Sequence, residues 1–300
     1  MKTAPYQGMK HFLVTVLLLA ASSSLFAKFN YPPEMEGAES IAYKTIGDVT
    51  MNLYVFKPQD WKAEDTRPVA VFFFGGGWSA GSPEQFEEHC KHLAMRGMVA
   101  ITADYRVATR NGTKANSCLK DARDAIRYLR SHANELGIDP DHVAAGGGSA
   151  GGHLAAALGT IPDDEESVSS RPNLMLLFNP ACVLAPFDGK QPWPEDRSAE
   201  FIEKTGVDPV EISPIHHVSA ETPAGIIFHG TDDDSVPFAT SKQFATEVRK
   251  AGGRCELKSY EGQPHGFFNY GRNDNVMFYK TLNAMDAFLV DLGWLPENPN

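Results

Sequence analysis

Basic residues are scarce in this sequence, and their scarcity excludes several classes of partner. The 300 residues carry 27 lysines and arginines against 38 aspartates and glutamates, a net charge of −11. No cluster of lysine and arginine interrupts this acidic balance, so we expect binding neither to nucleic acid nor to an anionic membrane surface. Internal repeats and long low-complexity segments are also absent, and 42% hydrophobic residues suffice for one large core.

Apolar runs long enough to cross a bilayer are missing as well. Residues 12–21 form an apolar run that is too short for this purpose. A basic start precedes the run, and residues 22–27 after it are a plausible cleavage region, although Leu25 is bulky for its position. This pattern predicts a signal peptide over residues 1–27 and a secreted or periplasmic protein. Translation from Met1 or from Met9 would both give such a signal. No cysteine directly follows the run, so we expect no stable membrane anchor.

Cysteine is rare and widely spaced, at positions 90, 118, 182 and 255. An oxidising compartment after export would permit disulfides, but the spacing fits no metal motif and does not determine a pairing. Buried free thiols are the favoured interpretation.

The apolar patterns alternate between strands and helices over one domain, residues 28–300. Such alternation predicts an α/β fold with a largely parallel sheet covered on both faces, and a hairpin turn at Gly47–Asp48 predicts an antiparallel edge. The expected strands are 41–46, 51–56, 69–74, 98–103, 142–145, 174–178, 224–228 and 256–260, and the expected helices are 82–96, 118–132, 238–251 and about 275–292.

Residues 181–218 break this alternation. The segment contains several prolines and is long for a connection within an α/β unit. We interpret it as a lid-like insertion with a short helix at about residues 198–205, lying over the carboxyl edge of the sheet.

The motif Gly-Gly-Ser-Ala-Gly at residues 147–151 lies between an expected strand and an expected helix. A G-x-S-x-G in this position is typical of a nucleophile elbow, in which the serine is held in a strained turn and the glycines leave room for it. Ser149 is therefore the candidate nucleophile. Its hydroxyl would lie at a helix N-terminus, where negative charge is stabilised.

A serine nucleophile needs a base and a group that orients the base. His265 follows the expected strand 256–260, and the carboxylates of residues 232–234 follow the strand 224–228. The order Ser, Asp, His is the one used by this type of fold, and all three segments fall at the carboxyl ends of strands, where ligands bind. Spacing alone leaves the choice among the three aspartates open.

Glycines at residues 75–77 close the strand 69–74. Because glycine lets a backbone N–H approach a ligand closely, this loop is a candidate oxyanion hole, and the N–H of Ala150 would be a further donor.

Six motifs together give the chain a specific family resemblance over about residues 39–291. It resembles the α/β-hydrolase esterases of the hormone-sensitive-lipase and bacterial acetyl- and feruloyl-esterase type, acetylxylan esterases included. The resemblance implies an eight-stranded, mostly parallel sheet. It also implies Ser149 as nucleophile, Asp233 as acid, His265 as base, and an oxyanion hole from the amides of Gly76, Gly77 and Ala150, without cofactor or metal. The motifs are FGGGW at 74–78, DYR at 104–106, GGSAGG at 147–152, SPIHHV at 213–218, HGTDD at 229–233 and HGFF at 265–268.

One residue departs from the family pattern. The family usually has histidine before the three glycines, where this chain has Phe74. Such a side chain normally braces the loop, so we expect catalysis to survive and the rigidity of the loop and the shape of the acyl pocket to change.

The expected activity is that of a secreted serine carboxylesterase on short-chain acyl esters, acetyl or feruloyl groups on carbohydrate. Substrate partners would then be small-molecule or polysaccharide esters. A general acetyl-esterase or lipase, a prolyl-oligopeptidase-like peptidase and a non-catalytic protein on the same scaffold are the alternatives. Trp78, Trp193 and Phe268 are candidate substrate-binding residues because aromatic walls suit acyl, aryl or sugar groups. For Phe267 the sequence does not decide between substrate binding and core packing.

Several polar residues are expected to have structural roles. His153 lies inside the helix after Ser149 and is expected to pack rather than act as a base. His89 and His92 are three residues apart on a helix, and a solvated face explains them better than metal binding because no third ligand is evident. Asp104 and Arg106 are expected to brace the loop after their strand.

Overall fold

The structure is a computed structural model that describes residues 31–163, 167–193 and 195–297. The predicted signal peptide, residues 1–27, lies outside the described residues. Within the described residues no helix is both long enough and apolar enough to cross a membrane.

An eight-stranded sheet in the order β1-β2-β4-β3-β5-β6-β7-β8 forms the centre of the fold. β1 and β2 form an antiparallel hairpin, β2 is antiparallel to β4, and the remaining neighbours are parallel. The predicted mostly parallel sheet with a hairpin at its edge is therefore confirmed. The strands are β1 (Glu39–Ile46), β2 (Val49–Phe56), β3 (Arg67–Phe73), β4 (Val99–Ala103), β5 (Ile138–Gly148), β6 (Leu174–Phe178), β7 (Ala224–Gly230) and β8 (Cys255–Tyr260).

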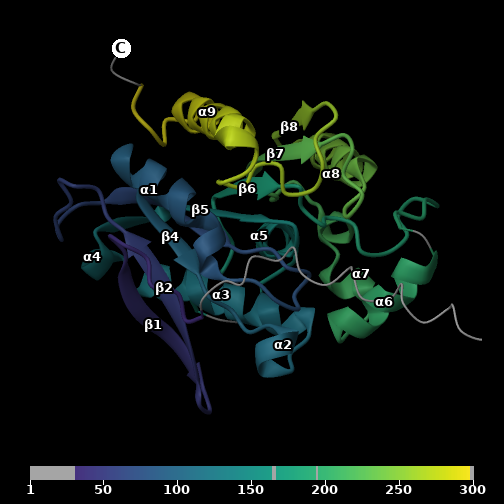
Figure 1. Cartoon of the computed structure of the whole chain (residues 1–300), viewed down its shortest axis with the longest axis horizontal. Helices are drawn as coiled ribbons and strands as arrows, with labels where there is room; N and C mark the ends of the chain where they lie inside the picture. The colour runs from purple at the N-terminus through teal and green to yellow at the C-terminus, as the bar shows by residue number, and fades with distance from the viewer. Residues whose placement is uncertain (1–30, 164–166, 194, 298–300) are drawn as a thin grey trace, which may run out of the picture.

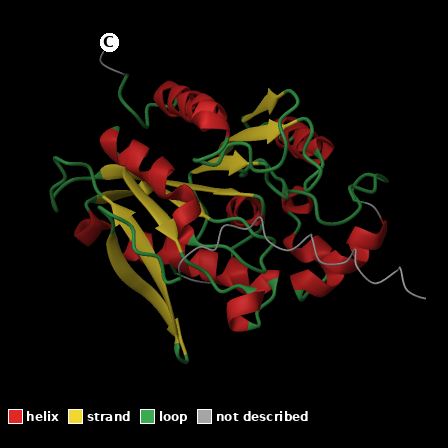
Figure 2. Ribbon diagram, viewed as in Figure 1, coloured by secondary structure: helices red, strands yellow, loops and turns green. Residues whose placement is uncertain are grey.

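Helices cover both faces of the sheet (Figures 1 and 2). The central strands β4 and β6 are fully buried along their length, which explains why their sequences are continuously apolar. One face packs against α1 (Glu87–Met95) and α9 (Val276–Asp291). The other face packs against α3 (Ala115–Ser131), α5 (Ala150–Thr160) and α8 (Phe238–Lys250).

The remaining elements are short. The predicted helix 82–96 begins as a separate 3-10 turn, η1 (Pro83–Phe86), which Ser82 caps by accepting a hydrogen bond from the Glu84 N–H. The non-helical backbone of Phe86, with φ −107° and ψ 11°, separates this turn from α1. The other short elements are α2 (Ala108–Asn111), α4 (Ala133–Leu136), α6 (Glu195–Thr205), α7 (Pro209–Ile212), η2 (Pro214–His217) and η3 (Asn273–Asn275).

The segment predicted to be a lid-like insertion contains α6, α7 and η2, at the right of Figure 1. It is tied to the rest of the chain by backbone contacts, such as the Ile215 N–H to the Cys182 carbonyl at 3.1 Å. Trp193 and Phe201 pack together within it, with ring centroids 4.7 Å apart. Whether the segment acts as a lid stays a prediction.

The expectation of a solvated face for His89 is wrong. His89 is fully buried because α9 covers the side of α1 on which it lies. Five phenylalanine rings surround it with centroids 4.9–6.1 Å away, and both ring nitrogens lack a hydrogen-bond partner among the described residues. Burial, with a smaller contribution from His92, lowers the pKa of His89 to about 3. His92 instead lies 2.9 Å from the Asp286 carboxylate.

All four cysteines are buried and none forms a disulfide. The interpretation as buried free thiols is confirmed.

Candidate active site

Ser149 occupies a strained turn between β5 and α5. Its backbone has φ 54° and ψ −114°, the strained conformation that the elbow motif predicts. The Ser149 N–H donates to the Phe178 carbonyl at 2.9 Å, which ties the turn to the end of β6. Side chains at the flanking glycines are excluded, because a Cβ on Gly147 would lie 2.5 Å from the Phe73 carbonyl oxygen and a Cβ on Gly151 would overlap the same group. The motif therefore reflects local steric requirements.

Asp233 and His265 meet across the loops that follow β7 and β8. The His265 Nδ1 donates to Asp233 Oδ2 at 2.7 Å, and the other carboxylate oxygen accepts the N–H groups of Ser235 and Val236 at 2.9 and 2.7 Å. Asp232 and Asp234 are exposed, so Asp233 is the member of the acidic run that faces His265.

His229 supports the same carboxylate from behind. Its Nε2 lies 3.0 Å from both Asp233 Oδ2 and the Val236 carbonyl oxygen, and its Nδ1 lies 2.7 Å from the Ser241 hydroxyl. Because both neighbours of Nε2 can only accept, Nε2 carries the proton and Nδ1 accepts from Ser241. Burial alone would raise the pKa of Asp233, but hydrogen bonds from His229 and His265 hold it well below its usual range.

The glycine loop after β3 lies against the serine. A Cβ on Gly75 would be 3.4 Å from the Ser149 Cβ, so the two backbones are in close approach. Gly76 and Gly77 have φ values of 123° and 61°, which glycine adopts without strain. Ala150 begins α5, where the N–H groups of the first turn have no acceptor within the helix.

Phe74 occupies the position at which the family usually has histidine, and it braces the loop by packing. Its ring stacks on Tyr105 with centroids 4.1 Å apart, and its carbonyl accepts the Tyr105 hydroxyl at 2.6 Å. Asp104 accepts the Tyr105 N–H at 2.9 Å, and Arg106 pairs with Asp121 at 2.8 Å, in keeping with the bracing expected of both residues.

The three candidate substrate-binding aromatic residues are buried. Trp78 packs against His153, which accepts its indole N–H at 3.2 Å, and the indole of Trp193 donates to the Val183 carbonyl at 2.6 Å. Phe268 is fully buried among Phe86 and Phe178, directly beside Gly148. Phe267 is also buried. Phe267 and Phe268 thus pack as core residues, and contact of any of the three candidates with substrate stays a prediction.

His153 has the packing role that its sequence position favoured. It is fully buried, and its Nε2 lies 2.7 Å from the Ile212 carbonyl. Burial lowers its pKa to about 4, so the ring is neutral at ordinary pH.

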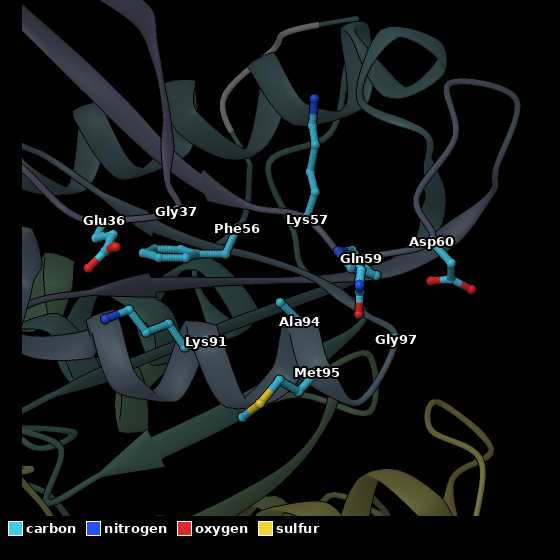
Figure 3. A pocket seen from close by; sticks show the side chains of 11 residues that line it. Glu36, Gly37, Phe56, Lys57, Gln59, Asp60, Lys91, Ala94, Met95 and Gly97 are labelled. Carbon is cyan, nitrogen blue, oxygen red and sulfur yellow. The ribbon is translucent and has the colours of Figure 1, made fainter.

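Two hollows are found among the described residues, one bordering the site and one far from it. One, of about 300 Å³, adjoins the glycine loop at Gly77 and Trp78 and has Lys114, Glu203 and Lys204 on its wall. The other, of about 890 Å³, lies between the end of β2 and α1 (Figure 3). Phe56 in this second hollow pairs with Ala100 near the start of β4, so the hollow is at the end of the sheet opposite to Ser149. Among the described residues no group of three or more histidine, cysteine, aspartate or glutamate residues could hold a metal ion.

Three amide side chains near the site were not predicted from the sequence. Gln85, Asn179 and Asn269 each bond to the backbone of a loop that holds a candidate catalytic residue or the glycine loop. Asn179 directly follows β6, a position at which a polar residue signals a site; nothing in the sequence marks Gln85 or Asn269.

Residues 70–269 match the family described as alpha/beta hydrolase fold. The chain belongs to this family.

Solved structures of esterase 2 from the planctomycete Thermogutta terrifontis are similar over almost the whole chain. The propionate-bound form is 47% identical with a TM-score of 0.85, and the match covers 90% of this chain and 100% of that one. The form phosphorylated by paraoxon is 48% identical with a TM-score of 0.82, covering 91% and 100%.

Curated relatives from Mycobacterium tuberculosis include the probable carboxylic ester hydrolase LipM and the esterase LipC. They are 26% and 30% identical, and each match covers 69% of this chain but only 52% and 56% of the relative. The chain thus spans about half the length of these curated relatives. Their names and those of the solved structures agree with the ester hydrolase that the motifs predict.

Proposed function

We propose that this chain is a serine carboxylesterase in which Ser149, His265 and Asp233 act together. The observation that carries the proposal is the 2.7 Å hydrogen bond between Asp233 and His265, at the sheet edge where Ser149 sits in a strained elbow. A carboxylate bound to Nδ1 keeps the proton on that nitrogen. The Nε2 of His265 then carries the lone pair that a general base needs.

The reaction proceeds through an acyl-enzyme. The Ser149 hydroxyl oxygen attacks the ester carbonyl carbon while His265 Nε2 takes its proton. The tetrahedral intermediate then collapses, and the alcohol leaves with the proton from His265. A water molecule, deprotonated by His265, attacks the acyl carbon. The bond between this carbon and Ser149 Oγ then breaks, the acid is released, and His265 returns the proton to Ser149. Asp233 stays ionised throughout because its pKa is far below neutral, and it stabilises the imidazolium that forms in each half-reaction.

The oxyanion of each tetrahedral intermediate would be stabilised by the backbone N–H groups of Gly76, Gly77 and Ala150. Such donors act in a site that is already in place before the reaction, and losing one costs about 3–4 kcal/mol in known enzymes. The close approach of Gly75 to Ser149 supports the assignment, because it brings the glycine loop to the nucleophile.

Short acyl groups are the proposed substrates. The similar esterase 2 has been solved with propionate and with butyrate bound, which supports a small acyl pocket. An alcohol that carries hydroxyl groups, such as a sugar, would suit the charged hollow beside Gly77, where Lys204 and Glu203 lie. Export by the signal peptide 1–27 remains part of the proposal, and it would place the enzyme where acetylated or feruloylated polysaccharides occur.

Hydrolysis of p-nitrophenyl esters from acetate to palmitate, with ferulate added, tests this function. We expect activity to peak at short acyl chains, and Ser149→Ala to reduce kcat by at least about a thousandfold. The exposed Ser219 supplies the control variant Ser219→Ala, which should match the wild type. Equal rates for Ser149→Ala and wild type would refute the assignment. Hydrolysis of an aminoacyl anilide without ester hydrolysis would favour the peptidase.

A further inference from the structure

Two amide side chains connect the glycine loop to the loop that holds His265. The Gly75 N–H donates to Gln85 Oε1 at 2.6 Å, and Gln85 Nε2 donates to Asn269 Oδ1 at 2.9 Å. Asn269 Nδ2 in turn donates to the Gly266 carbonyl at 2.9 Å. The three bonds form a continuous path between segments that are 184 residues apart in sequence at the Gln85–Asn269 step.

The orientation of both amides follows from the two ends of the path. A backbone N–H at Gly75 requires an acceptor, so Gln85 must present its oxygen there. The Gly266 carbonyl oxygen can only accept, so Asn269 must present its nitrogen there. The two remaining groups, a donor on Gln85 and an acceptor on Asn269, then face each other with matching polarity.

The glutamine end of the path is held rigidly. Gln85 lies in η1, which is joined to β4 by the Thr102 hydroxyl donating to the Pro83 carbonyl at 2.8 Å. The neighbouring Phe86 is fully buried and stacks on Phe72 with centroids 4.9 Å apart. A side chain on such a support can set the position of its partner, because little of its own freedom remains.

The histidine end is held by two side chains together with one backbone hydrogen bond. Gly266 directly follows His265 and has φ 71°, a conformation that only a restrained or glycine-containing loop adopts. Its carbonyl accepts the side-chain Nδ2 of Asn269 at 2.9 Å and the backbone N–H of Asn269 at 3.2 Å, and its N–H donates to the buried Asn179 Oδ1 at 3.0 Å. Both peptide groups that flank Gly266 are therefore bonded to side chains, and the Asn269 side chain makes the shorter of the two bonds to the carbonyl.

We propose that Gln85 is a positioning residue, which through Asn269 fixes the position of the glycine loop relative to the loop that holds His265. The inference rests on the proposed function, because the relative position of the two loops affects catalysis only if His265 and the N–H groups of the glycine loop act in one reaction. Gln85 also occupies the Gly75 N–H, which leaves Gly76 and Gly77 as the loop donors for the oxyanion. Loss of the path would separate the base from the donors without removing either, and misplacement by about 1 Å can cost a hundredfold in rate.

The test compares Gln85→Met, Asn269→Leu and the double variant in the full chain. Methionine keeps the length and apolar stem of Gln85 and removes its hydrogen bonds. We expect kcat on p-nitrophenyl acetate to fall at least about tenfold in each single variant, with KM within about twofold of wild type. Because the residues act as one path, the double variant should lose no more than about twofold beyond the worse single variant.

Two features of the design keep the result interpretable. Paraoxon phosphorylates the similar esterase 2, so it serves here to titrate active sites, and kcat is expressed per titrated site. Gln243→Leu is the matched control, a half-buried glutamine on α8 that should leave kcat unchanged. If Gln85→Met fails to fold, Asn269→Asp replaces it, because aspartate keeps the acceptor for Gln85 while it replaces the donor to Gly266 by a charged acceptor that repels the carbonyl oxygen.

The outcomes separate this inference from the proposed function. A wild type that hydrolyses no ester and does not react with paraoxon refutes the proposed function. An active wild type with Gln85→Met or Asn269→Asp within twofold of it in kcat overturns the positioning role alone. If the fold losses in kcat of the two single variants multiply in the double variant, the positioning role is also overturned, because Gln85 and Asn269 would then act independently.

Discussion

Replacing His89 by leucine should make the folded protein more stable. The imidazole is fully buried, and neither nitrogen has a hydrogen-bond partner among the described residues. Burying a polar group in this way costs about 1–3 kcal/mol, and leucine has a similar volume without polar atoms. We therefore expect His89→Leu to raise the free energy of unfolding by about 1–3 kcal/mol at pH 7.

The gain should grow as the pH falls. Burial lowers the pKa of His89 from 6.5 to about 3, so between these values the unfolded chain binds a proton that the folded protein does not. Stability is then lost as the pH falls below about 6.5, at about 1.4 kcal/mol per pH unit. At pH 5 the wild type should have lost a further ~2 kcal/mol through this residue alone. His89→Leu removes that loss.

Equilibrium unfolding in urea at pH 7 and pH 5 measures both effects. The control is His92→Leu, which removes the partner of Asp286 and should lower stability at each pH. A His89→Leu protein that is less stable than wild type at pH 7 would refute the argument from unpaired nitrogens. A stability difference that does not widen at pH 5 would refute the argument from the pKa.

Three further predictions concern the site. Asp233→Asn should reduce kcat on p-nitrophenyl acetate by about 10⁴-fold, because an amide favours the wrong tautomer of His265, and a loss under tenfold would contradict the assignment. Gly151→Ala should lower the melting temperature or prevent folding, because the added Cβ overlaps the Phe73 carbonyl. A variant that melts at the same temperature as the wild type would contradict this prediction. Tyr105→Phe removes the hydroxyl that donates to the Phe74 carbonyl and should cost about 1–2 kcal/mol in urea unfolding, an effect that an unchanged midpoint would exclude.

Much of the fold could be predicted because its signals are local. Continuous apolar strands such as β6 and the Gly47–Asp48 turn are visible within a few residues, and parallel-sheet topology follows from their alternation with helices. The elbow at Ser149 can be recognised for the same reason, because close contacts with the backbone of the adjoining β3 and α5 require its glycines.

Features that depend on distant segments could not be predicted in the same way. The helical spacing of His89 and His92 carries no sign that α9, nearly two hundred residues later, covers one of them and supplies Asp286 to the other. Gln85 and Asn269 are single polar residues whose pairing exists only in the folded chain. Phe268 lies in a loop without a periodic apolar pattern, and its burial beside Gly148 follows from how the loop after β8 folds back.

The buried cysteines give the folded chain four internal reporters of its own opening. Burial raises the pKa of Cys118 and of Cys255 to about 12, and raises those of Cys90 and Cys182 well above the usual range. The reactive thiolate is therefore negligible at neutral pH, and alkylation has to wait until a segment opens. Cys90 belongs to the core under α1 and the other three to the core on the opposite face. Mass spectrometry of alkylated peptides can thus time the exposure of each face separately.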